Sequence, residues 1–467
     1  MAKKNKLIDA LLKLNLFYYS GKTCFIDSET KAPFFFDINS INSFPFYKPL
    51  FLDSLVSLIK KISGYKGKKN KELLLAAVGH SGIPFTALAA NKLSLPMIYI
   101  RDSSKKHGKK NMIEGSVKEG ITTILFTETL SSKAKIENGV KALNEKKSNI
   151  KAIITIFDML DVSEIKTDED IIPVYSLISL ASFIEYAEKN KIINKKIIEA
   201  MAKWSKNCSG SLSPAPCSDA SVAAEDASQT SLHKSGAGKT TCVSSKESCE
   251  ASDNAQKAAK TLLDIKAITL SLKEPFRYAS GILSPIYCDN RLLVSNPKKW
   301  NIIIDIMEQI IKTEIGIQNI EVIAGTSTAG IPHAALLAER FSLPMIYVKS
   351  EKGEIQKKSN IEGSLFYGKK VLVIEDLVST GKSSIESVKI LREHGAIVDY
   401  CVAIFTYQME SAEKTFAEEK CSLITASNFK TLIKTAVAKK YITDEEAEKA
   451  VNWNSDPTDW GKKYGYE

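Results

Sequence analysis

A chain of 467 residues is too long for one ordinary domain, and its 44% hydrophobic and 25% charged residues are typical of a soluble globular protein. No apolar run approaches the roughly 20 residues needed to span a bilayer, so we expect no membrane partner. The net charge of +10 comes almost wholly from scattered lysines. Because no arginine and aromatic cluster accompanies them, we expect no nucleic-acid partner either.

The first predicted element is an amphipathic helix over residues 7–16. Asp9, Lys13 and Asn15 interrupt its apolar positions, whereas the core of a signal peptide is an uninterrupted apolar run. The eight cysteines include no Cys-x-x-Cys pair, so we expect reduced thiols and neither a disulfide framework nor a zinc site. These features together predict a cytoplasmic protein.

Two parts of the chain, residues 1–204 and 256–467, repeat one another. Four short matches share one offset of 248 residues, without a gap. They are Gly82–Pro84 with Gly330–Pro332, Ser94–Tyr99 with Ser342–Tyr347, Ile113–Ser116 with Ile361–Ser364, and Val140-Lys141 with Val388-Lys389. The chain therefore holds two copies of one domain, which we call the first copy (1–204) and the second copy (256–467).

Between the copies, residues 205–255 are dominated by Ser, Ala, Gly, Pro and Lys, with almost no large aliphatic side chain. Such a segment cannot bury enough apolar surface to offset the entropy lost on ordering, so we expect a flexible linker. Its stretch Gly236–Thr241 is faintly similar to a nucleotide-binding P-loop. The first glycine of that pattern would fall at His233, and no strand precedes it, so no nucleotide site is predicted there.

The second copy alternates short β-rich runs with helical patterns. The predicted strands are residues 321–325, 344–348, 370–375 and 398–406, and the helices between them include 333–340 and 384–393. This order predicts an α/β fold for each copy, with a mostly parallel sheet flanked by helices. Ligands of such folds bind at the carboxyl ends of the strands.

The segment Val371–Ser384 carries the clearest chemistry. A hydrophobic strand ends in Glu375 and Asp376, and a small glycine-containing loop then begins a helix. Backbone N–H groups at a helix N-terminus bind phosphate, and the adjacent carboxylates can accept hydrogen bonds from sugar hydroxyls. Further hydroxyl donors are Ser379, Thr380 and Ser383. The pattern indicates a ribose 5-phosphate site; the alternative is that the carboxylates merely cap a turn before an ordinary helix start.

The whole segment resembles the binding signature of type I phosphoribosyltransferases, and Gly325–Pro332 resembles the loop with which that family binds diphosphate. The resemblance implies a set of residues that bind 5-phosphoribosyl 1-diphosphate. They are Thr326, Ser327, Thr328, Ala329, Gly330, Lys349, Glu375, Asp376, Leu377, Val378, Ser379, Thr380, Gly381, Lys382 and Ser383.

The base is indicated by Phe276–Arg291, which closely resembles the amino-terminal segment of orotate phosphoribosyltransferases; the resemblance to those enzymes covers nearly all of 256–467. It implies that Tyr287 stacks on orotate, that Arg291 pairs with an anionic group, and that Ser379 also contacts orotate. The alternative is an ordinary hairpin with a buried tyrosine and a surface arginine.

Members of this family have a mobile loop of pattern Arg-x-x-x-Lys-x-His-Gly whose Lys and His reach the diphosphate. The second copy has Gly353 and Ile355 at the Lys and His positions, and neither side chain can donate a charge-assisted hydrogen bond. The first copy keeps Arg101, Lys105 and His107 in register. It has instead lost a carboxylate, the loop glycine and the base-segment arginine, at Thr127, Lys133 and Asn39.

These defects are complementary. We therefore expect the halves to pair as an intrachain pseudo-dimer, or chains to pair as a homodimer, with the loop from the first copy and the pocket from the second. The resemblance implies that orotate and 5-phosphoribosyl 1-diphosphate yield orotidine 5′-phosphate and diphosphate, in UMP synthesis. Arg101, Lys105, His107 and Asp376 would be catalytic, and Mg²⁺ would be held mainly through the diphosphate, without a direct protein ligand. The alternatives are a regulator that binds the ribosyl diphosphate without turnover, or transfer to another base.

Overall fold

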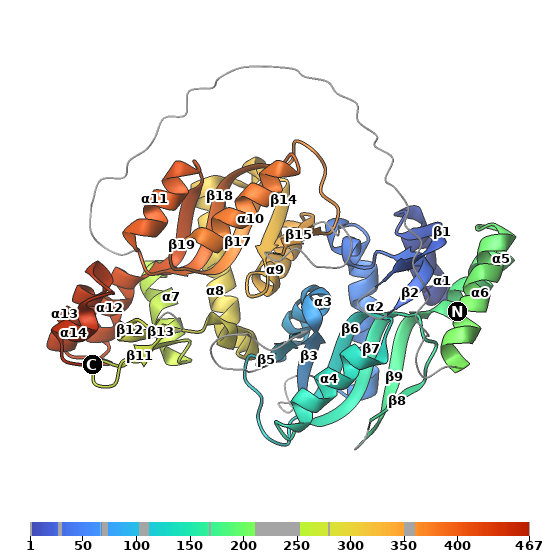
Figure 1. Cartoon of the computed structure of the whole chain (residues 1–467), viewed down its shortest axis with the longest axis horizontal. Coiled ribbons are helices and arrows are strands. Elements are labelled where there is room, and N and C mark those ends of the chain that lie inside the picture. Colours follow the sequence, from blue (N-terminus) through green and yellow to red (C-terminus); the bar gives the residue numbers. More distant parts are fainter. Residues whose placement is uncertain are drawn as a thin grey trace.

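The computed structural model describes residues 2–26, 30–65, 67, 73–101, 112–167, 170–210, 253–278, 281–349 and 360–466. The two copies form two lobes that lie side by side, the first copy in blue to green and the second in yellow to red (Figure 1). The predicted linker overlaps their ends, because helix α6 (Lys195–Gly210) continues to Gly210 and α7 (Asp253–Asp264) begins at Asp253. Residues 211–252 lie outside the described residues.

The first copy is built on a seven-stranded sheet of order β5-β4-β3-β6-β7-β9-β8. Its strands are β3 (Leu73–Val78), β4 (Met97–Ile100), β5 (Ile113–Glu114), β6 (Thr122–Leu130), β7 (Asn149–Asp158), β8 (Glu164–Lys166) and β9 (Ile171–Ser179). β5 and β8 pair antiparallel at the two edges, and the other five strands are parallel. Every residue of β3 and β4 is buried, as expected for parallel strands covered on both faces.

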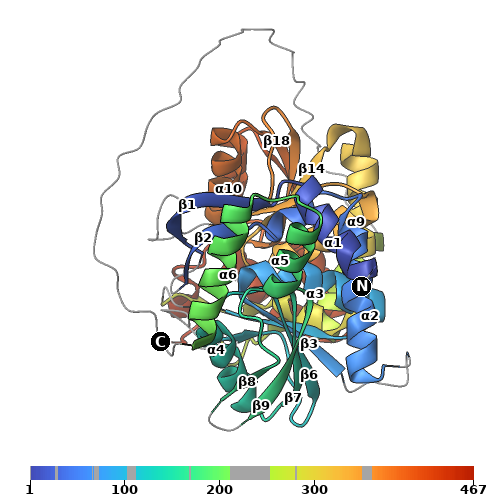
Figure 2. The same ribbon diagram turned by 90° about the vertical axis from the view of Figure 1, so that its right-hand side faces the viewer.

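Helices cover this sheet, and an antiparallel pair of β1 (Phe17–Phe25) and β2 (Lys31–Phe36) lies beside it (Figure 2). The helices are α1 (Ala2–Lys13), α2 (Lys48–Ser63), α3 (Gly79–Leu93), α4 (Lys133–Asn144), α5 (Leu180–Lys189) and α6. Along β3, Leu75 and Ala77 share a core with α2 and α3, while Leu74 and Ala76 share a core with α4. The first helix ends three residues before the predicted end, because Asn15 adopts a left-handed conformation (φ 53°) just after it.

The second copy has a six-stranded sheet of order β16-β15-β14-β17-β18-β19. Its strands are β14 (Val322–Thr326), β15 (Met345–Val348), β16 (Ile361–Glu362), β17 (Lys370–Val378), β18 (Ile397–Thr406) and β19 (Ser422–Asn428), parallel except for β16. The pairs β4 and β15, β5 and β16, β6 and β17, and β7 and β18 have bounds 248 positions apart, the offset of the sequence repeat. The predicted α/β class, with two like copies, is confirmed.

The remaining elements of the second copy surround this sheet. The helices are α7, α8 (Pro297–Ile310), α9 (Ile331–Phe341), α10 (Lys382–Glu393), α11 (Glu410–Glu418), α12 (Phe429–Ala438), α13 (Asp444–Ser455) and α14 (Trp460–Lys463). Two small antiparallel sheets join β10 (Ile268–Leu270) to β13 (Ile286–Cys288) and β11 (Phe276–Arg277) to β12 (Leu283–Ser284). None of the helices in the described part of the chain has the length and apolar character needed to cross a membrane.

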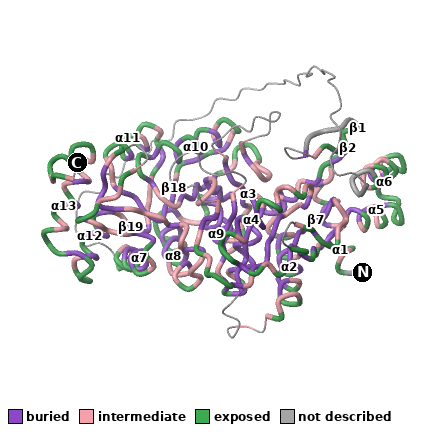
Figure 3. Tube along the Cα trace, turned by 60° about the horizontal axis from the view of Figure 1, so that its bottom comes forward, coloured by how far each residue is buried: buried purple, intermediate pink, exposed green. Residues whose placement is uncertain are grey.

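One hydrophobic core runs through both copies. Helices α3 and α9 pack against each other, and the same core cluster contains Phe85 and Leu88 of α3 together with Ile331 and Ala335 of α9. Figure 3 shows the buried tube around α3 and α9 in the middle of the molecule. The copies are therefore joined by buried apolar surface, the main favourable contribution to protein association.

Polar contacts across this junction come in matched pairs. Ser43 Oγ donates to the carbonyl oxygen of Met345 (3.0 Å) and accepts from the amide of Ser364 (2.9 Å). In the reciprocal contact, Ser295 Oγ donates to the carbonyl oxygen of Met97 (2.9 Å). Ser43 and Ser295 end the equivalent 3₁₀ helices η1 (Asn39–Ser43) and η2 (Asn290–Ser295). Such reciprocity is the property of a two-fold interface, here formed within one chain.

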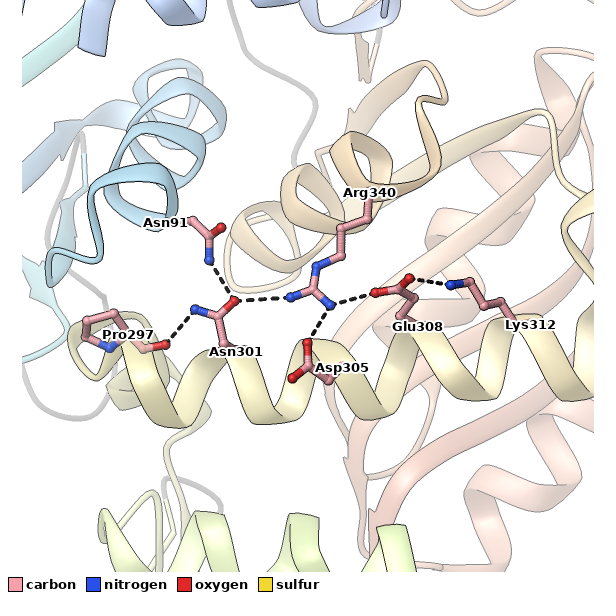
Figure 4. Close-up of polar contacts among 7 residues, drawn as sticks. All are labelled: Asn91, Pro297, Asn301, Asp305, Glu308, Lys312 and Arg340. Carbon is pink, nitrogen blue, oxygen red and sulfur yellow. Dashed lines mark hydrogen bonds and ion pairs between the residues drawn. The ribbon is translucent and has the colours of Figure 1, made fainter. Parts of the chain in front are cut away.

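A second polar group joins the copies at the side of the helices (Figure 4). Asn91 of α3 donates through Nδ2 to Asn301 Oδ1 of α8 (2.9 Å), which also accepts from Arg340 of α9 (3.1 Å). Arg340 is held in turn by Asp305 (2.7 Å) and Glu308 (2.6 Å). These contacts are partly exposed, so we expect them to align the helices more than to stabilise the junction.

Candidate active site

The predicted phosphate loop follows β17 and leads into α10. Gly381 is the residue before the helix and has φ of +78°, a left-handed conformation that favours glycine. A Cβ atom there would lie 3.0 Å from the ring of Phe416. Ser379, Thr380 and Ser383 are exposed along this loop and the first turn of α10. The loop therefore presents hydroxyl and amide groups to solvent at the start of a helix, as a phosphate site requires.

The predicted diphosphate loop lies directly beside it, between β14 and α9. A Cβ atom on Gly330 would lie 2.5 Å from the carbonyl oxygen of Ile374 and 2.5 Å from Thr326 Oγ1, so only glycine fits. Thr326 Oγ1 itself donates to the carbonyl of Ile374 (3.2 Å). Because β14 and β17 are neighbouring parallel strands, their two loops meet at the same edge of the sheet.

Two adjacent carboxyl groups lie at this edge, near the end of β17. Glu375 is 6% exposed; its Oε1 accepts from the amide of Asp376 (3.0 Å) and its Oε2 accepts from Ser384 Oγ (3.0 Å). Burial and the neighbouring Glu375 carboxylate raise the pKa of Asp376 well above its ordinary range, and Arg291 opposes this effect. The pair therefore resists carrying two negative charges until a cation or a hydrogen-bond donor arrives.

A cavity of about 310 Å³ opens where these loops meet. Its lining residues are Arg101, Cys288, Asp289, Arg291, Thr326, Ser327, Thr328, Ala329, Glu375, Asp376, Leu377, Ser383 and Ser387. All of them belong to the second copy except Arg101, which follows β4 of the first copy. The cavity of the second copy is thus completed by a cationic side chain from the first.

An ion-pair network joins the copies at this cavity. Glu114 of β5 lies 2.8 Å from Arg101 Nε through one carboxylate oxygen and 2.5 Å from Arg291 Nη1 through the other. The Arg101 contact is an ion pair without the alignment of a hydrogen bond. Arg291 Nε also pairs with Asp289 (2.5 Å), and these two carboxylates raise the pKa of Arg291 against the effect of its burial. Both guanidinium groups are therefore held in place in the structure.

A direct contact between the copies also reaches the diphosphate loop. His80 Nε2 lies 3.0 Å from Thr328 Oγ1, a hydrogen bond whose donor depends on the histidine tautomer. The two residues are 248 positions apart, so each is the counterpart of the other in the repeat. They meet on the pseudo-two-fold axis that relates the copies.

The structure brings ten of the predicted site residues together around the cavity: Arg101, Arg291, Thr326, Ser327, Thr328, Ala329, Glu375, Asp376, Leu377 and Ser383. Gly330, Val378 and Gly381 are buried beneath the loops, and Ser379, Thr380 and Lys382 are exposed beside them. The ring of Tyr287 packs against Phe276, 5.5 Å between centroids, and does not line the cavity. Lys105 and His107 lie outside the described residues.

Lys349 lies elsewhere. Its Nζ pairs with Glu362, whose other carboxylate oxygen accepts from Asn39 Nδ2 of the first copy (3.3 Å). Lys349 and Glu362 are the counterparts of Arg101 and Glu114, and Asn39 matches Arg291. Lys349 therefore lies beside the region of the first copy that is equivalent to the second copy's cavity. Each copy thus places its residue of this pair, Arg101 or Lys349, at the other copy's region.

The first copy's counterpart of the phosphate loop is closed by its own side chains. Ser81 Oγ donates to Glu128 Oε2 (2.5 Å), the carboxylate equivalent to Asp376. Thr127 Oγ1 donates to the same oxygen (3.3 Å), and α4 begins directly at Lys133 with no glycine before it. The remaining carboxylate is thus occupied by hydroxyls of the protein.

The sequence reasoning missed four residues of the site and its network: Glu114, Cys288, Asp289 and Ser387. Signals existed for two of them, since Ile-Glu-Gly-Ser occurs in both copies at the common offset and Asp289 is matched by Asp37 at a slightly different offset. A charged residue repeated in both copies indicates a role beyond packing. Cys288 and Ser387 carry no such signal, because small buried or half-buried residues are common throughout a folded domain.

A family model for the phosphoribosyl transferase domain matches residues 292–438, within the second copy. Orotate phosphoribosyltransferase of Coxiella burnetii is 48% identical over 208 residues, which make up 44% of this chain and 99% of that protein. The chain belongs to the orotate phosphoribosyltransferase family. A further family member, from Listeria innocua, is 45% identical over 207 residues, 44% of this chain and 98% of that protein. The resemblance seen in the sequence is confirmed.

Solved structures of similar proteins include orotate phosphoribosyltransferase from Aeropyrum pernix, which is 26% identical and covers 40% of this chain and 99% of its own at a TM-score of 0.35. UMP synthase of Leishmania donovani is 15% identical and covers 86% of this chain and 79% of its own at a TM-score of 0.38.

Proposed function

We propose that the chain is an orotate phosphoribosyltransferase with one site built from both copies. It would transfer the 5-phosphoribosyl group from its diphosphate to N1 of orotate, releasing diphosphate. The observation that carries the proposal is the position of Arg101, a first-copy residue that lines the cavity between the two anion-binding loops of the second copy. The names of the curated relatives support orotate as the base.

The reaction needs no covalent nucleophile from the protein, because departure of diphosphate leaves an oxocarbenium-like sugar that orotate N1 attacks. The protein must align the two substrates and stabilise the negative charge that develops on the diphosphate. The guanidinium of Arg101 and the backbone amides of Thr328 and Ala329 would serve the second task, since the amides of Ser327 and Gly330 already donate to the carbonyl oxygens of Val348 and Thr326. Lys105 and His107, on the same loop as Arg101, would add further donors.

The sugar would lie over the end of β17. Asp376 lines the cavity and Glu375 is anchored by Ser384, so Asp376 is the freer acceptor for a ribose hydroxyl. The 5-phosphate would lie against the exposed hydroxyls of Ser379, Thr380 and Ser383 at the start of α10. Arg291 would pair with the carboxylate of orotate, and the sequence resemblance adds Tyr287 and Ser379 as base contacts, although Tyr287 does not line the cavity.

Charge around the cavity supports a magnesium cofactor. Among the described lining residues, the carboxyl groups of Asp289, Glu375 and Asp376 face the guanidinium groups of Arg101 and Arg291. A polyanionic substrate would gain little from this balance without an added cation. The described residues contain no group of three or more His, Cys, Asp or Glu side chains placed to hold a metal ion. Mg²⁺ would be held mainly through the diphosphate and would supply positive charge to the leaving group.

The test is an orotate-dependent diphosphate-release assay on the full chain, with uracil, hypoxanthine and adenine as competing bases. We expect release with orotate only. Release of diphosphate with another base would show that the chain is a phosphoribosyltransferase for that base. Binding of 5-phosphoribosyl 1-diphosphate with no release for any base would favour the regulatory alternative.

A mixing experiment tests how the site is assembled. His107→Ala removes a residue of the first copy's loop, and Asp376→Asn alters the second copy's cavity. Neither variant alone should be active. If the copies pair within one chain, the mixture stays inactive. Recovery of about a quarter or more of the activity on mixing would instead show that loops are exchanged between chains, since mixed dimers would contain one intact site.

A further inference from the structure

The repeated Ile-Glu-Gly-Ser segment lies at the seam between the copies. In the first copy it begins with β5, which pairs Glu114 with Tyr99 of β4. A Cβ atom on Gly115 (φ +107°) would lie 2.8 Å from Ser295 Oγ, and the amide of Ser116 donates to that same oxygen (2.8 Å). The backbone on both sides of Glu114 is therefore fixed, by its own sheet and by the second copy.

The side chain of Glu114 reaches across this seam. Its carboxylate contacts Arg101 of its own copy at 2.8 Å and Arg291 of the other copy at 2.5 Å. Glu114 is 6% exposed, and the side chains of Arg101 and Arg291 are 24% and 15% exposed. A buried carboxylate that joins two arginines of one cavity is costly to desolvate, and it persists because both oxygens are paired.

The two arginines serve different parts of the proposed reaction. Both line the cavity; in the proposed reaction Arg101 would stabilise the leaving diphosphate and Arg291 would pair with the base. Without a shared anion, these two cations would repel each other across a poorly solvated cavity and would sample other rotamers. Asp289 would still hold Arg291, but no other ion pair of the described residues holds Arg101.

We propose that Glu114, a residue of the first copy, is a positioning residue of the second copy's site, where it holds Arg101 and Arg291 ready for the two substrates. The inference rests on the proposed function. Removing its charge leaves the cavity more positive by one unit, which favours binding of anionic substrates, but frees Arg101. The loss should therefore fall on kcat and not on KM.

The chain supplies a matched control. Glu362 occupies the equivalent position of the second copy and pairs with Lys349 and Asn39, at the counterpart whose phosphate loop is closed by Ser81 and Thr127. Glu362→Gln makes the same chemical change in the same motif at the same seam. It lies outside the proposed site, so it reports only the structural cost of the change.

The experiment compares Glu114→Gln, Glu114→Asp and Glu362→Gln with the unaltered chain, by steady-state kinetics in both substrates and by thermal unfolding. We expect Glu114→Gln to lower kcat about tenfold or more, with both KM values unchanged or lower. Glu114→Asp keeps the charge but is one methylene too short to reach both arginines, so it should lower kcat less. Glu362→Gln should match the unaltered chain in kcat.

Two results would overturn the inference alone: equal kcat for Glu114→Gln and Glu362→Gln, or a loss that appears only as higher KM values. If Glu114→Gln does not fold, Glu114→Asp decides, because unaltered kcat in that variant contradicts a positioning role. An unaltered chain that is inactive with orotate overturns the proposed function, and this inference with it.

Discussion

The two copies have the same sheet but different loops at its carboxyl edge. β6 and β17 share bounds at the repeat offset, yet the first is followed by Lys133 and the second by Gly381 in a left-handed conformation. Where Asp376 lines an open cavity, its counterpart Glu128 accepts hydrogen bonds from Ser81 and Thr127. Both loops are compatible with the packing of the sheet, but only the loop of the second copy has the glycine and the cavity-lining carboxyl group that a phosphoribosyl site needs.

Each copy also places one cationic residue at the other copy's site, and here the first copy is the one that keeps the family's residue. The first copy lends Arg101, and the second lends Lys349 to a counterpart that has lost its phosphate loop. One site can therefore be complete while the other lacks parts on both sides. Under the proposed function, the duplicated chain would divide a two-fold arrangement into a working half and a supporting half, and the predictions below test that division.

The largest expected effect comes from the carboxylate at the end of the strand. Asp376→Asn replaces one of the two carboxyl oxygens proposed to accept from the ribose hydroxyls with an amide donor and removes the ionisable group, and we expect kcat/KM to fall by about 10²–10³. Glu128→Gln is the same change at the equivalent position of the first copy, and it should leave kcat/KM within about twofold. Steady-state assays of both variants decide the matter. Equal losses would show that the first copy has a working site of its own.

The next effect concerns the glycine of the phosphate loop. Gly381→Ala places a Cβ atom at φ +78° and 3.0 Å from the Phe416 ring, which should cost about 1–2 kcal/mol of folding stability. The displaced amides should raise KM for 5-phosphoribosyl 1-diphosphate about tenfold while KM for orotate changes little. Denaturant unfolding and kinetics in both substrates measure these effects.

Lys133→Gly is the reciprocal change in the first copy, and it should create no second site, because Ser81 still occupies Glu128. Titration of this variant with the ribosyl diphosphate should give the same stoichiometry as the unaltered chain. A doubled stoichiometry would contradict the view that the first copy is closed by its own hydroxyls.

A buried histidine marks a difference in the cores. His333 of α9 accepts from Trp300 Nε1 (2.9 Å), whereas the first copy has Phe85 at the equivalent position. Burial lowers the pKa of His333 to about 3. As pH falls, His333 is therefore protonated in the unfolded chain at a higher pH than in the folded chain. Its contribution to stability is therefore complete above the unfolded pKa of about 6.5 and is lost as pH falls toward 3.

The variant His333→Phe copies the first copy's residue and tests this linkage. It leaves Trp300 Nε1 without its acceptor, which should cost about 1–3 kcal/mol at pH 7. Between pH 7 and pH 4.5 the unaltered chain should lose about 2–3 kcal/mol more than the variant. Denaturant unfolding at both pH values measures the difference, and equal losses would mean that His333 is protonated in the folded state.

Much of this organisation was predictable from the sequence. The strands, the two copies and the phosphate loop follow from apolar runs, a gap-free offset and one glycine-containing segment, all of which are local in the chain. The network of Glu114 with Arg291 was not predictable, because it joins residues that are far apart in sequence through the packing of α3 against α9. Lys349 was assigned to the second copy's site, but it pairs with Glu362 at the first copy's counterpart of that site, a placement that depends on how the copies pack and not on local sequence.

The smallest expected effect concerns the axis itself, where the two copies present different residues to each other. His80 contacts Thr328 of the diphosphate loop, so His80→Ala removes a partner of that loop without touching the cavity. We expect KM for 5-phosphoribosyl 1-diphosphate to rise about two- to fivefold, the value of one partly exposed hydrogen bond, with KM for orotate unchanged. His80→Thr would place threonine on both sides of the axis and make the contact symmetric. If His80→Thr restores KM, the first copy supports the site through a hydrogen bond that its counterpart could equally supply; if only histidine suffices, the support has become specific to the first copy.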